Sequence, residues 1–294
     1  MSQRIRLESG QIEQIPLLLS FPEHQQPCPL VFYIPGYTST KEAGLSLAYR
    51  LARRGLACLC FDPLYHGARA DPRLTQAADP AFGGVYPAET GLDTGILFFQ
   101  IIRQCALDVG KLMAHLAGDP RLDLQRCAVT GVSLGAYASF LALADLPALR
   151  AAVPMMGLPT FGQRWRDLLD ETAWSNPAWA EALAGVTAHT RQHSELIEGI
   201  DPAERLLQNP RPLLIMNGDF DSDQPKLYVL HWLRMARLAY ASSPDRLAWR
   251  VYPVGHTVTP QMEADAVEWL AGQLTSMEST DERREHLPVP FRDA

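Results

Sequence analysis

The 294-residue sequence has few cysteines, and none of them forms the Cys-x-x-Cys pair of redox motifs. The five are Cys28, Cys58, Cys60, Cys105 and Cys127. Cys58 and Cys60 lie in an apolar stretch, which favours small buried side chains over a disulfide framework. This pattern fits a reducing compartment, and we expect a cytoplasmic location.

The sequence also lacks an excess of positive charge and long apolar runs. Its 26 Lys and Arg against 33 Asp and Glu give a net charge of −7, which argues against nucleic acid as a partner. No stretch approaches the roughly 18 uncharged apolar residues of a membrane-spanning helix. The opening residues MSQRIRLESG have no apolar core. We therefore expect neither a membrane span nor a signal peptide.

What the sequence does contain is an alternation of short apolar runs with helical patterns. The runs predict strands at 15–21, 30–36, 56–62, 126–132, 149–157, 211–219 and 247–254. Helical spacing of apolar residues predicts helices at 41–55, 95–118, 133–145, 225–240 and 259–274. Strands that are apolar throughout are buried on both faces, and their alternation with helices indicates a parallel sheet. We predict an α/β fold with about eight strands, of which the early ones are antiparallel.

Two stretches interrupt this alternation. Residues 67–92 are rich in Pro, Gly and Ala and predict a long loop between a strand and its helix. Residues 158–210 separate two predicted strands by far more than an ordinary connection. We interpret this insert as a cap over a site, with a structural elaboration as the alternative. The predicted organisation is a core of residues 1–157 and 211–274, the cap, and a polar tail at 275–294.

The motif AVTGVSLG at 128–135 contains the candidate nucleophile, Ser133. It lies where a predicted strand meets a predicted helix, the edge of an α/β sheet at which ligands bind. A sharp turn there needs small neighbours, which Gly131 and Gly135 supply. The alternative is an ordinary Gly/Ser connection, because a Gly-x-Ser-x-Gly pattern by itself is common. The junction favours the nucleophile.

A serine nucleophile needs a base, and the sequence has eight histidines. His256 is the candidate because it follows the predicted strand 247–254 and so lies at the same sheet edge as Ser133. His66, in the loop after another strand, has two interpretations. It could line the cleft, or it could be a hydrogen-bonded loop histidine, and we favour the second.

The base in turn needs an orienting carboxylate. The loop NGDFDSDQP offers Asp219, Asp221 and Asp223, although such a loop could also cap a helix or bind a cation. Asp223 stands two residues before Pro225 and is the capping candidate. We predict Asp221 as the acid, which gives the chain order serine, aspartate, histidine of the α/β-hydrolase fold.

These residues carry a resemblance to the α/β-hydrolase superfamily over about residues 12–274. The sequence is similar to its bacterial esterases of the dienelactone-hydrolase-like or prolyl-oligopeptidase-like kind. The motifs are FYIPGYTST (32–40), FDPLYHGAR (61–69), GVSLGA (131–136), LLIMNGDFDSDQP (213–225) and VGHTVTP (254–260).

The resemblance assigns further roles. It implies that the backbone N–H groups of Tyr37 and Leu134 bind the oxyanion, although Pro35 replaces the family's histidine before Gly36. The family's Gly-x-x-Asp spacing also places the acid on Asp221.

The activity implied is hydrolysis of a small carboxylic ester or lactone through an acyl-enzyme, without metal or organic cofactor. Dienelactone hydrolases proper use cysteine where this chain has Ser133, and haloalkane dehalogenases use aspartate. An amidase or peptidase on the same triad, and a non-catalytic hydrolase-like binding protein, are the alternatives. We expect Phe82, Tyr86 and Trp165 to shape the pocket, with His66 as a further pocket candidate if it lines the cleft. An apolar cap face could support a homodimer.

Overall fold

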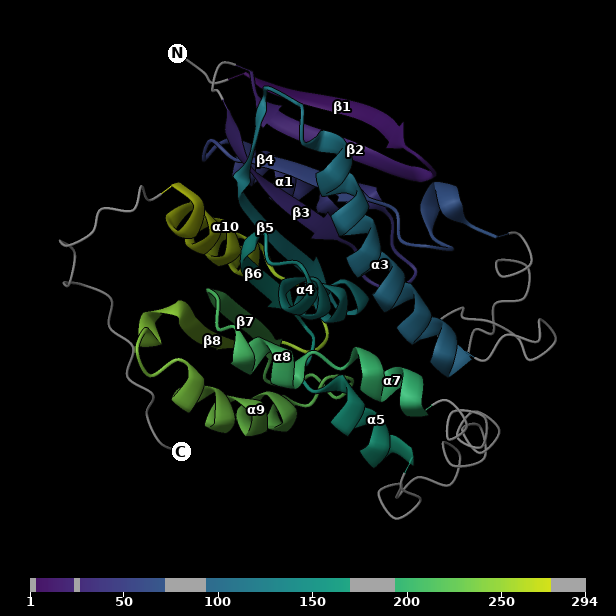
Figure 1. Cartoon of the computed structure of the whole chain (residues 1–294), viewed down its shortest axis with the longest axis vertical. Helices are drawn as coiled ribbons and strands as arrows, with labels where there is room; N and C mark the ends of the chain where they lie inside the picture. The colour runs from purple at the N-terminus through teal and green to yellow at the C-terminus, as the bar shows by residue number, and fades with distance from the viewer. Residues whose placement is uncertain (1–3, 24–26, 72–93, 170–193, 276–294) are drawn as a thin grey trace.

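A single sheet organises the chain, whose computed structural model describes residues 4–23, 27–71, 94–169 and 194–275 (Figure 1). The sheet has eight strands in the order β1-β2-β4-β3-β5-β6-β7-β8. Their bounds are β1 Ile5–Ile12, β2 Ile15–Pro22, β3 Cys28–Ile34, β4 Ala57–Phe61, β5 Leu122–Val132, β6 Leu149–Met155, β7 Leu213–Gly218 and β8 Leu247–Tyr252. Strands β1, β2 and β4 pair antiparallel. All pairs from β4 to β8 are parallel, which confirms the predicted architecture.

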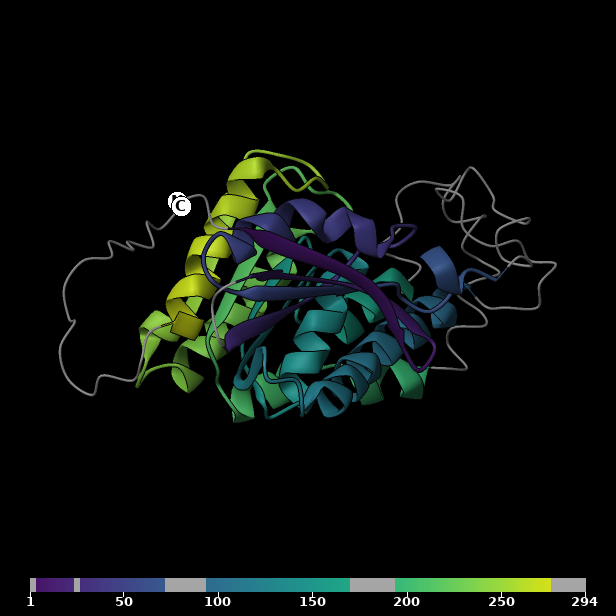
Figure 2. The same cartoon turned by 90° about the horizontal axis from the view of Figure 1, so that it is seen from above.

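Helices cover both faces of the sheet (Figure 2). The helices are α1 Leu45–Ala52, α3 Thr94–Leu116, α4 Leu134–Asp145, α5 Phe161–Leu169, α7 Ser194–Ile200, α8 Ala203–Gln208, α9 Lys226–Ala239 and α10 Pro260–Thr275. Apolar side chains of α1 and α10 fill one core layer, and those of α3, α4 and α9 fill the other. None of these helices, within the described ranges, is long and apolar enough to cross a membrane.

Strand β3 shows why a continuous apolar run forms the centre of this sheet. Leu30, Phe32 and Ile34 point into the layer of α3 and α4, whereas Val31 and Tyr33 point into the layer of α1 and α10. Because successive side chains of a strand face opposite ways, an apolar residue at every position is stable only where both faces are covered. The sheet therefore fixes the carboxyl ends of its central strands between two packed layers.

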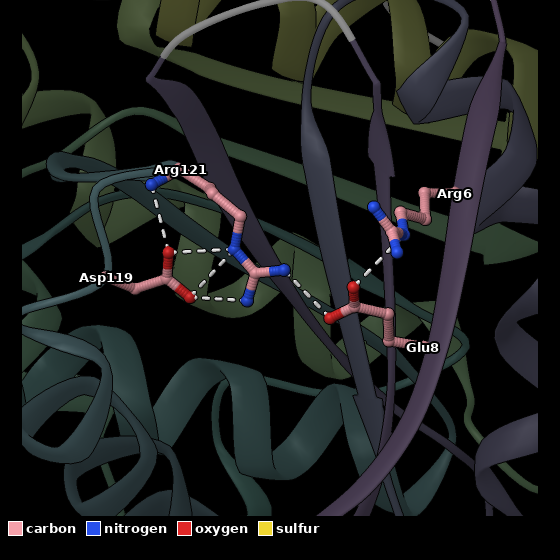
Figure 3. A network of polar contacts seen from close by, with 4 residues as sticks. All are labelled: Arg6, Glu8, Asp119 and Arg121. Carbon is pink, nitrogen blue, oxygen red and sulfur yellow. Dashed lines mark hydrogen bonds and ion pairs between the residues drawn. The ribbon is translucent and has the colours of Figure 1, made fainter.

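The edge strand β1 was absent from the predicted strands because it has a polar, half-exposed sequence. It pairs with β2 over its whole length, from Ile5 to Ile12. The Glu8 carboxylate of this strand also forms ion pairs with Arg121, at 2.8 Å, and with Arg6, at 3.3 Å (Figure 3). Arg121 pairs as well with Asp119 at 2.7 Å, so the network ties the edge strand to the turn before β5.

The described parts of the 158–210 insert are helices α5, α7 and α8. Their Phe161, Ile197, Ile200 and Leu206 are buried in the same cluster as α3 and α4. The insert therefore packs on the core of the main sheet through these helices. Residues 72–93 and 170–193, with the predicted pocket residues Phe82 and Tyr86, lie outside the described part of the chain.

The packing of α10 gives a stability prediction. Leu270 is fully buried, whereas Leu238 on α9 is 84% exposed. Leu270→Ala removes buried methyl groups and leaves a cavity, so we expect it to lower the free energy of unfolding by about 2–5 kcal/mol. Leu238→Ala is the control, with an expected change within about 0.5 kcal/mol. Urea denaturation measures both, and equal losses would contradict the packing described.

Candidate active site

The turn between β5 and α4 holds Ser133 in a backbone conformation that L-residues rarely adopt, with φ 54° and ψ −112°. Such a conformation costs about 1–3 kcal/mol and persists only where neighbouring structure enforces it. The Ser133 N–H donates to the Met155 carbonyl at 2.9 Å, and the Ser133 carbonyl accepts from Ala136 and Tyr137 at the start of α4. These bonds hold the turn from both sides.

Close backbone contacts explain why glycine stands on both sides of Ser133, where the sequence predicts a sharp turn. A Cβ added at Gly135 would lie 1.9 Å from the Ile34 carbonyl oxygen, and one at Gly131 would lie 2.4 Å from the Gly135 oxygen. Helix α4 therefore starts in backbone contact with the end of β3. On the other side of the turn, a Cβ added at Gly36 would lie 3.3 Å from the Val132 carbonyl oxygen.

The structure brings the side chains of His256 and Asp221 into contact. His256 Nδ1 lies 2.8 Å from Asp221 Oδ2, and the Asp221 side chain is fully buried. Two backbone bonds join the loops that carry them, from Asp219 N–H to the Tyr252 carbonyl and from Phe220 N–H to the Val254 carbonyl. The parallel register of β7 and β8 thus places the acid and the histidine side by side.

The charges around this pair set its protonation. Burial alone would lower the pKa of His256, but the hydrogen bond and charge of Asp221 and the charge of Asp223 outweigh it, so the pKa lies above its usual 6.5. Burial would raise the pKa of Asp221, yet the His256 hydrogen bond and the N–H of Gln224 outweigh it and lower that pKa. Asp221 therefore stays ionised beside a histidine that gains a proton readily.

The other two aspartates of the loop have different surroundings. Asp219 pairs with Lys226 at the surface. Asp223 is exposed and does not cap α9, because Pro225 stands at the N-cap without a side-chain cap bond. Instead Asp221 Oδ1 accepts the N–H groups of Asp223, at 3.0 Å, and of Gln224, at 2.9 Å.

A metal ion is the alternative occupant of this cluster. One ligand atom each from Asp221, Asp223 and His256 lies within 4.8 Å of the others. Both Asp221 oxygens, however, already accept hydrogen bonds, two on Oδ1 and one on Oδ2. The donor set therefore fits a hydrogen-bonded acid–histidine pair better than a metal centre.

The loop that carries Tyr37 is anchored by a buried carboxylate, Asp62, from the motif FDPLYHGAR. Asp62, fully buried after β4, accepts the Lys41 backbone N–H at 2.9 Å, the Lys41 Nζ at 2.8 Å and the Ala68 N–H at 2.9 Å. Gly67 has φ +54°, and a Cβ there would lie 2.4 Å from the Asp62 carboxylate. Asp62 is the last residue of the predicted strand 56–62, at the sheet edge from which the acid loop also starts.

His66 shows the loop hydrogen bond that we favoured from the sequence. Its Nδ1 lies 2.8 Å from the Leu64 carbonyl, and burial lowers its pKa. The imidazole also packs against the Tyr37 ring, with centroids 5.3 Å apart. His66 is therefore a neutral, buried neighbour of the Tyr37 loop.

Positive φ angles recur at this edge of the sheet. Among the described non-glycine residues, Glu13 in the β1–β2 turn has a positive φ, and so do Thr38, Tyr65 and Met156, each of which follows the carboxyl end of a different parallel strand, as Ser133 does. Such strain clusters at functional sites. The sequence gives no sign of it, because none of these residue types favours positive φ.

A hydrogen bond that the sequence does not predict joins helix α4 to the acid loop. Tyr137, one turn after Ser133 on α4, hydrogen-bonds through its hydroxyl to Gln224 Oε1 at 2.5 Å. Gln224 in turn donates its N–H to Asp221. The predicted pocket residue Trp165 belongs to α5, whose neighbours Phe161 and Arg164 line a cavity beside Gln224, while the Trp165 side chain lies outside the described set.

Comparison with known proteins places this site in context. No family model matches the chain. The chain is 27% identical over 279 residues to "Esterase YjfP" of Escherichia coli (strain K12), covering 92% of this chain and 100% of the relative. It is 25% identical over 245 residues to "Putative esterase YitV" of Bacillus subtilis (strain 168), covering 83% and 89%.

Solved structures agree on the fold. TT1662 from Thermus thermophilus superposes with a TM-score of 0.64 at 22% identity, covering 93% of this chain and 100% of the other. An acetyl xylan esterase from Paenibacillus sp. R4 gives 0.62 at 18% identity, covering 93% and 90%. The chain has the α/β-hydrolase fold and is similar in sequence to proteins named as esterases. The strand-end loops of this fold carry Ser133, Asp221 and His256.

The backbone contact at the Ser133 turn can be tested directly. Gly135→Ala would force the added methyl group into the Ile34 carbonyl, so we expect a loss of more than about 3 kcal/mol of unfolding free energy or failure to fold. Gly199 on α7 is the control, because a Cβ there meets nothing within 4 Å. Gly199→Ala should be neutral or stabilising by up to about 1 kcal/mol. Thermal unfolding measures both, and a stable Gly135→Ala protein would contradict the contact.

Proposed function

We propose that this α/β-hydrolase cleaves a carboxylic ester or lactone through an acyl-enzyme on Ser133. The observation that carries the proposal is the His256–Asp221 hydrogen bond at the edge of the sheet where the Ser133 turn lies. The curated relatives are named as esterases, which supports ester hydrolysis as the general reaction.

The acid–histidine pair supplies the base. Because Asp221 accepts the hydrogen bond from Nδ1, the imidazole is held in the tautomer whose Nε2 is free to take a proton. His256 Nε2 removes the proton from Ser133 Oγ as the oxygen attacks the ester carbonyl. Asp221 stabilises the imidazolium that forms, which agrees with the raised pKa of His256.

The oxyanion of the tetrahedral intermediate is received by the backbone N–H groups of Tyr37 and Leu134. Leu134 is the first residue of α4, where helix geometry leaves the N–H without an intrahelical acceptor. Tyr37 follows Gly36, which lies against the Ser133 turn. One such donor typically contributes about 3–4 kcal/mol in the transition state. The Asp62 network is then a support that holds the Tyr37 loop in place.

The reaction ends with two transfers. His256 gives its proton to the leaving alcohol as the carbonyl re-forms, which leaves the acyl group on Ser133. Water then attacks with His256 again as base, and the carboxylic acid leaves with Ser133 restored. These steps need no metal or organic cofactor.

The surroundings complete the proposal. The helices of the 158–210 insert act as a cap at one side of the site, which the position of α5 beside the acid loop supports. A cytoplasmic location fits the five free, buried cysteines. A small-molecule ester is the expected partner, while dimer formation and the absence of nucleic-acid binding stay predictions.

The nucleophile is tested by Ser133→Ala. We expect kcat/KM for a short p-nitrophenyl ester to fall at least about a thousandfold, because no other group can carry the acyl intermediate. Ser46→Ala on α1 is the control, since Ser46 only bonds Glu263 at the surface. Full activity of a folded Ser133→Ala protein would remove Ser133 from the mechanism.

The acid is tested by comparing Asp221→Asn with Asp223→Asn over pH. Asp221→Asn should lower kcat by about 10⁴, because the amide no longer fixes the tautomer. Asp223→Asn should keep kcat within about tenfold. Since Asp223 raises the pKa of His256 and the base must be neutral, its removal should move the acid limb of kcat/KM to lower pH. The opposite ranking of the two variants would assign the acid to Asp223.

A further inference from the structure

A cavity of about 250 Å³ lies beside the acid loop and has no role in the mechanism above. Its lining residues are Phe98, Phe99, Tyr137, Phe161, Arg164, Asp223 and Gln224. An apolar cavity of about 150 Å³ is large enough to bind benzene. This cavity therefore has room for a six-membered ring with a short attachment.

Four aromatic side chains at this cavity pack against one another, so that each ring contacts two of the others. Centroid distances are 5.6 Å from Phe98 to Phe99, 5.8 Å from Phe99 to Phe161, 5.2 Å from Phe161 to Tyr137 and 5.8 Å from Tyr137 back to Phe98. Three of the four contacts are edge-to-face. Phe99, Phe161 and Tyr137 are buried and hold Phe98, which is half-buried and keeps surface for a further ring. An aromatic pair gains attraction beyond its buried area, so Phe98 favours an aromatic ring over a linear chain of equal area.

The cavity is joined to the α4 helix, the acid loop and the Tyr37 loop of the proposed site. Tyr137 lies one helical turn after Ser133, on the same side of α4. Gln224 lies three residues after Asp221 and bonds both Asp221 and Tyr137. Phe98 packs edge-on against Tyr37, with centroids 5.6 Å apart. A group bound in the cavity would therefore contact residues that are directly linked to the elements carrying Ser133, Asp221 and Tyr37.

The rim of the cavity carries charges of both signs. Arg164 is half-buried and stacks over Tyr228 at 5.5 Å, and Asp223 is exposed at the acid loop. One cation and one anion give no net preference for a charged group. The aromatic wall is therefore the feature that can discriminate between substrates.

We propose that this cavity binds the aromatic ring of an ester substrate, in its acyl or its alcohol part, and so makes the enzyme selective for aryl-bearing esters. The proposal rests on the ester hydrolysis assigned to Ser133. Concave sites with apolar walls and a few polar groups at the rim are typical of small-molecule binding.

The experiment compares kcat/KM for ethyl phenylacetate, benzyl acetate and ethyl acetate in the full-length protein and its variants. The first ester carries the ring in the acyl part and the second in the alcohol part. Phe98 is half-buried at the cavity, so Phe98→Ala is expected to fold. It should reduce the ratio of one aryl ester to ethyl acetate by about three- to tenfold, the range of a lost ring–ring contact. Whichever ester responds identifies the part that enters the cavity.

Two further variants sharpen the result. Tyr49→Ala removes an exposed aromatic ring on α1, outside the site, and should leave every ratio unchanged. Arg164→Gln removes the rim cation and should change the ratio less than twofold. A loss of selectivity in Arg164→Gln as large as that in Phe98→Ala would assign recognition to charge and overturn the proposal.

The three esters also distinguish an enzyme without the aromatic site from a protein without esterase activity. Hydrolysis of ethyl acetate with no effect of Phe98→Ala on either aryl ester would remove the ring site and leave the esterase in place. Absence of hydrolysis of all three esters by the wild-type protein would instead count against ester hydrolysis at Ser133.

Discussion

The backbone contact between the start of α4 and the end of β3 is the constraint on which the site depends. Gly135 lies so close to the Ile34 carbonyl that no side chain fits between them. This approach leaves the chain only a sharp turn from β5 into α4, and Ser133 occupies it at φ 54°. The strain is offset by the bonds to Met155, Ala136 and Tyr137, which hold Ser133 in a rigid turn.

The order of the strands explains how distant segments of the chain reach this turn. Because β3, β5, β6, β7 and β8 are parallel neighbours, their following loops emerge along one edge of the sheet. Asp221 and His256 follow adjacent strands and meet at 2.8 Å. The Tyr137–Gln224 bond then connects that pair to the serine's own helix. Asp221, His256 and Ser133 are thus held by the sheet rather than by independent loops.

Much of this arrangement could be predicted from the sequence. The central strands β3 and β4 are apolar at every position, so the parallel sheet followed from such runs and their alternation with helices. The glycines around Ser133 followed from the need for a tight turn. Strand β1 was missed because an exposed edge strand needs no apolar pattern. The Lys41–Asp62 anchor and the packing of rings around Phe98 depend on contacts between segments far apart in sequence, which no local pattern encodes.

The central claim is that Ser133 is the acylated residue, and the direct measurement is mass spectrometry of the protein after reaction with a fluorophosphonate. The account predicts one adduct, located by peptide mapping on the peptide that contains Ser133 and blocked by prior incubation with an ester substrate. An adduct at another residue, or ester hydrolysis that continues undiminished when Ser133 is fully labelled, would contradict it.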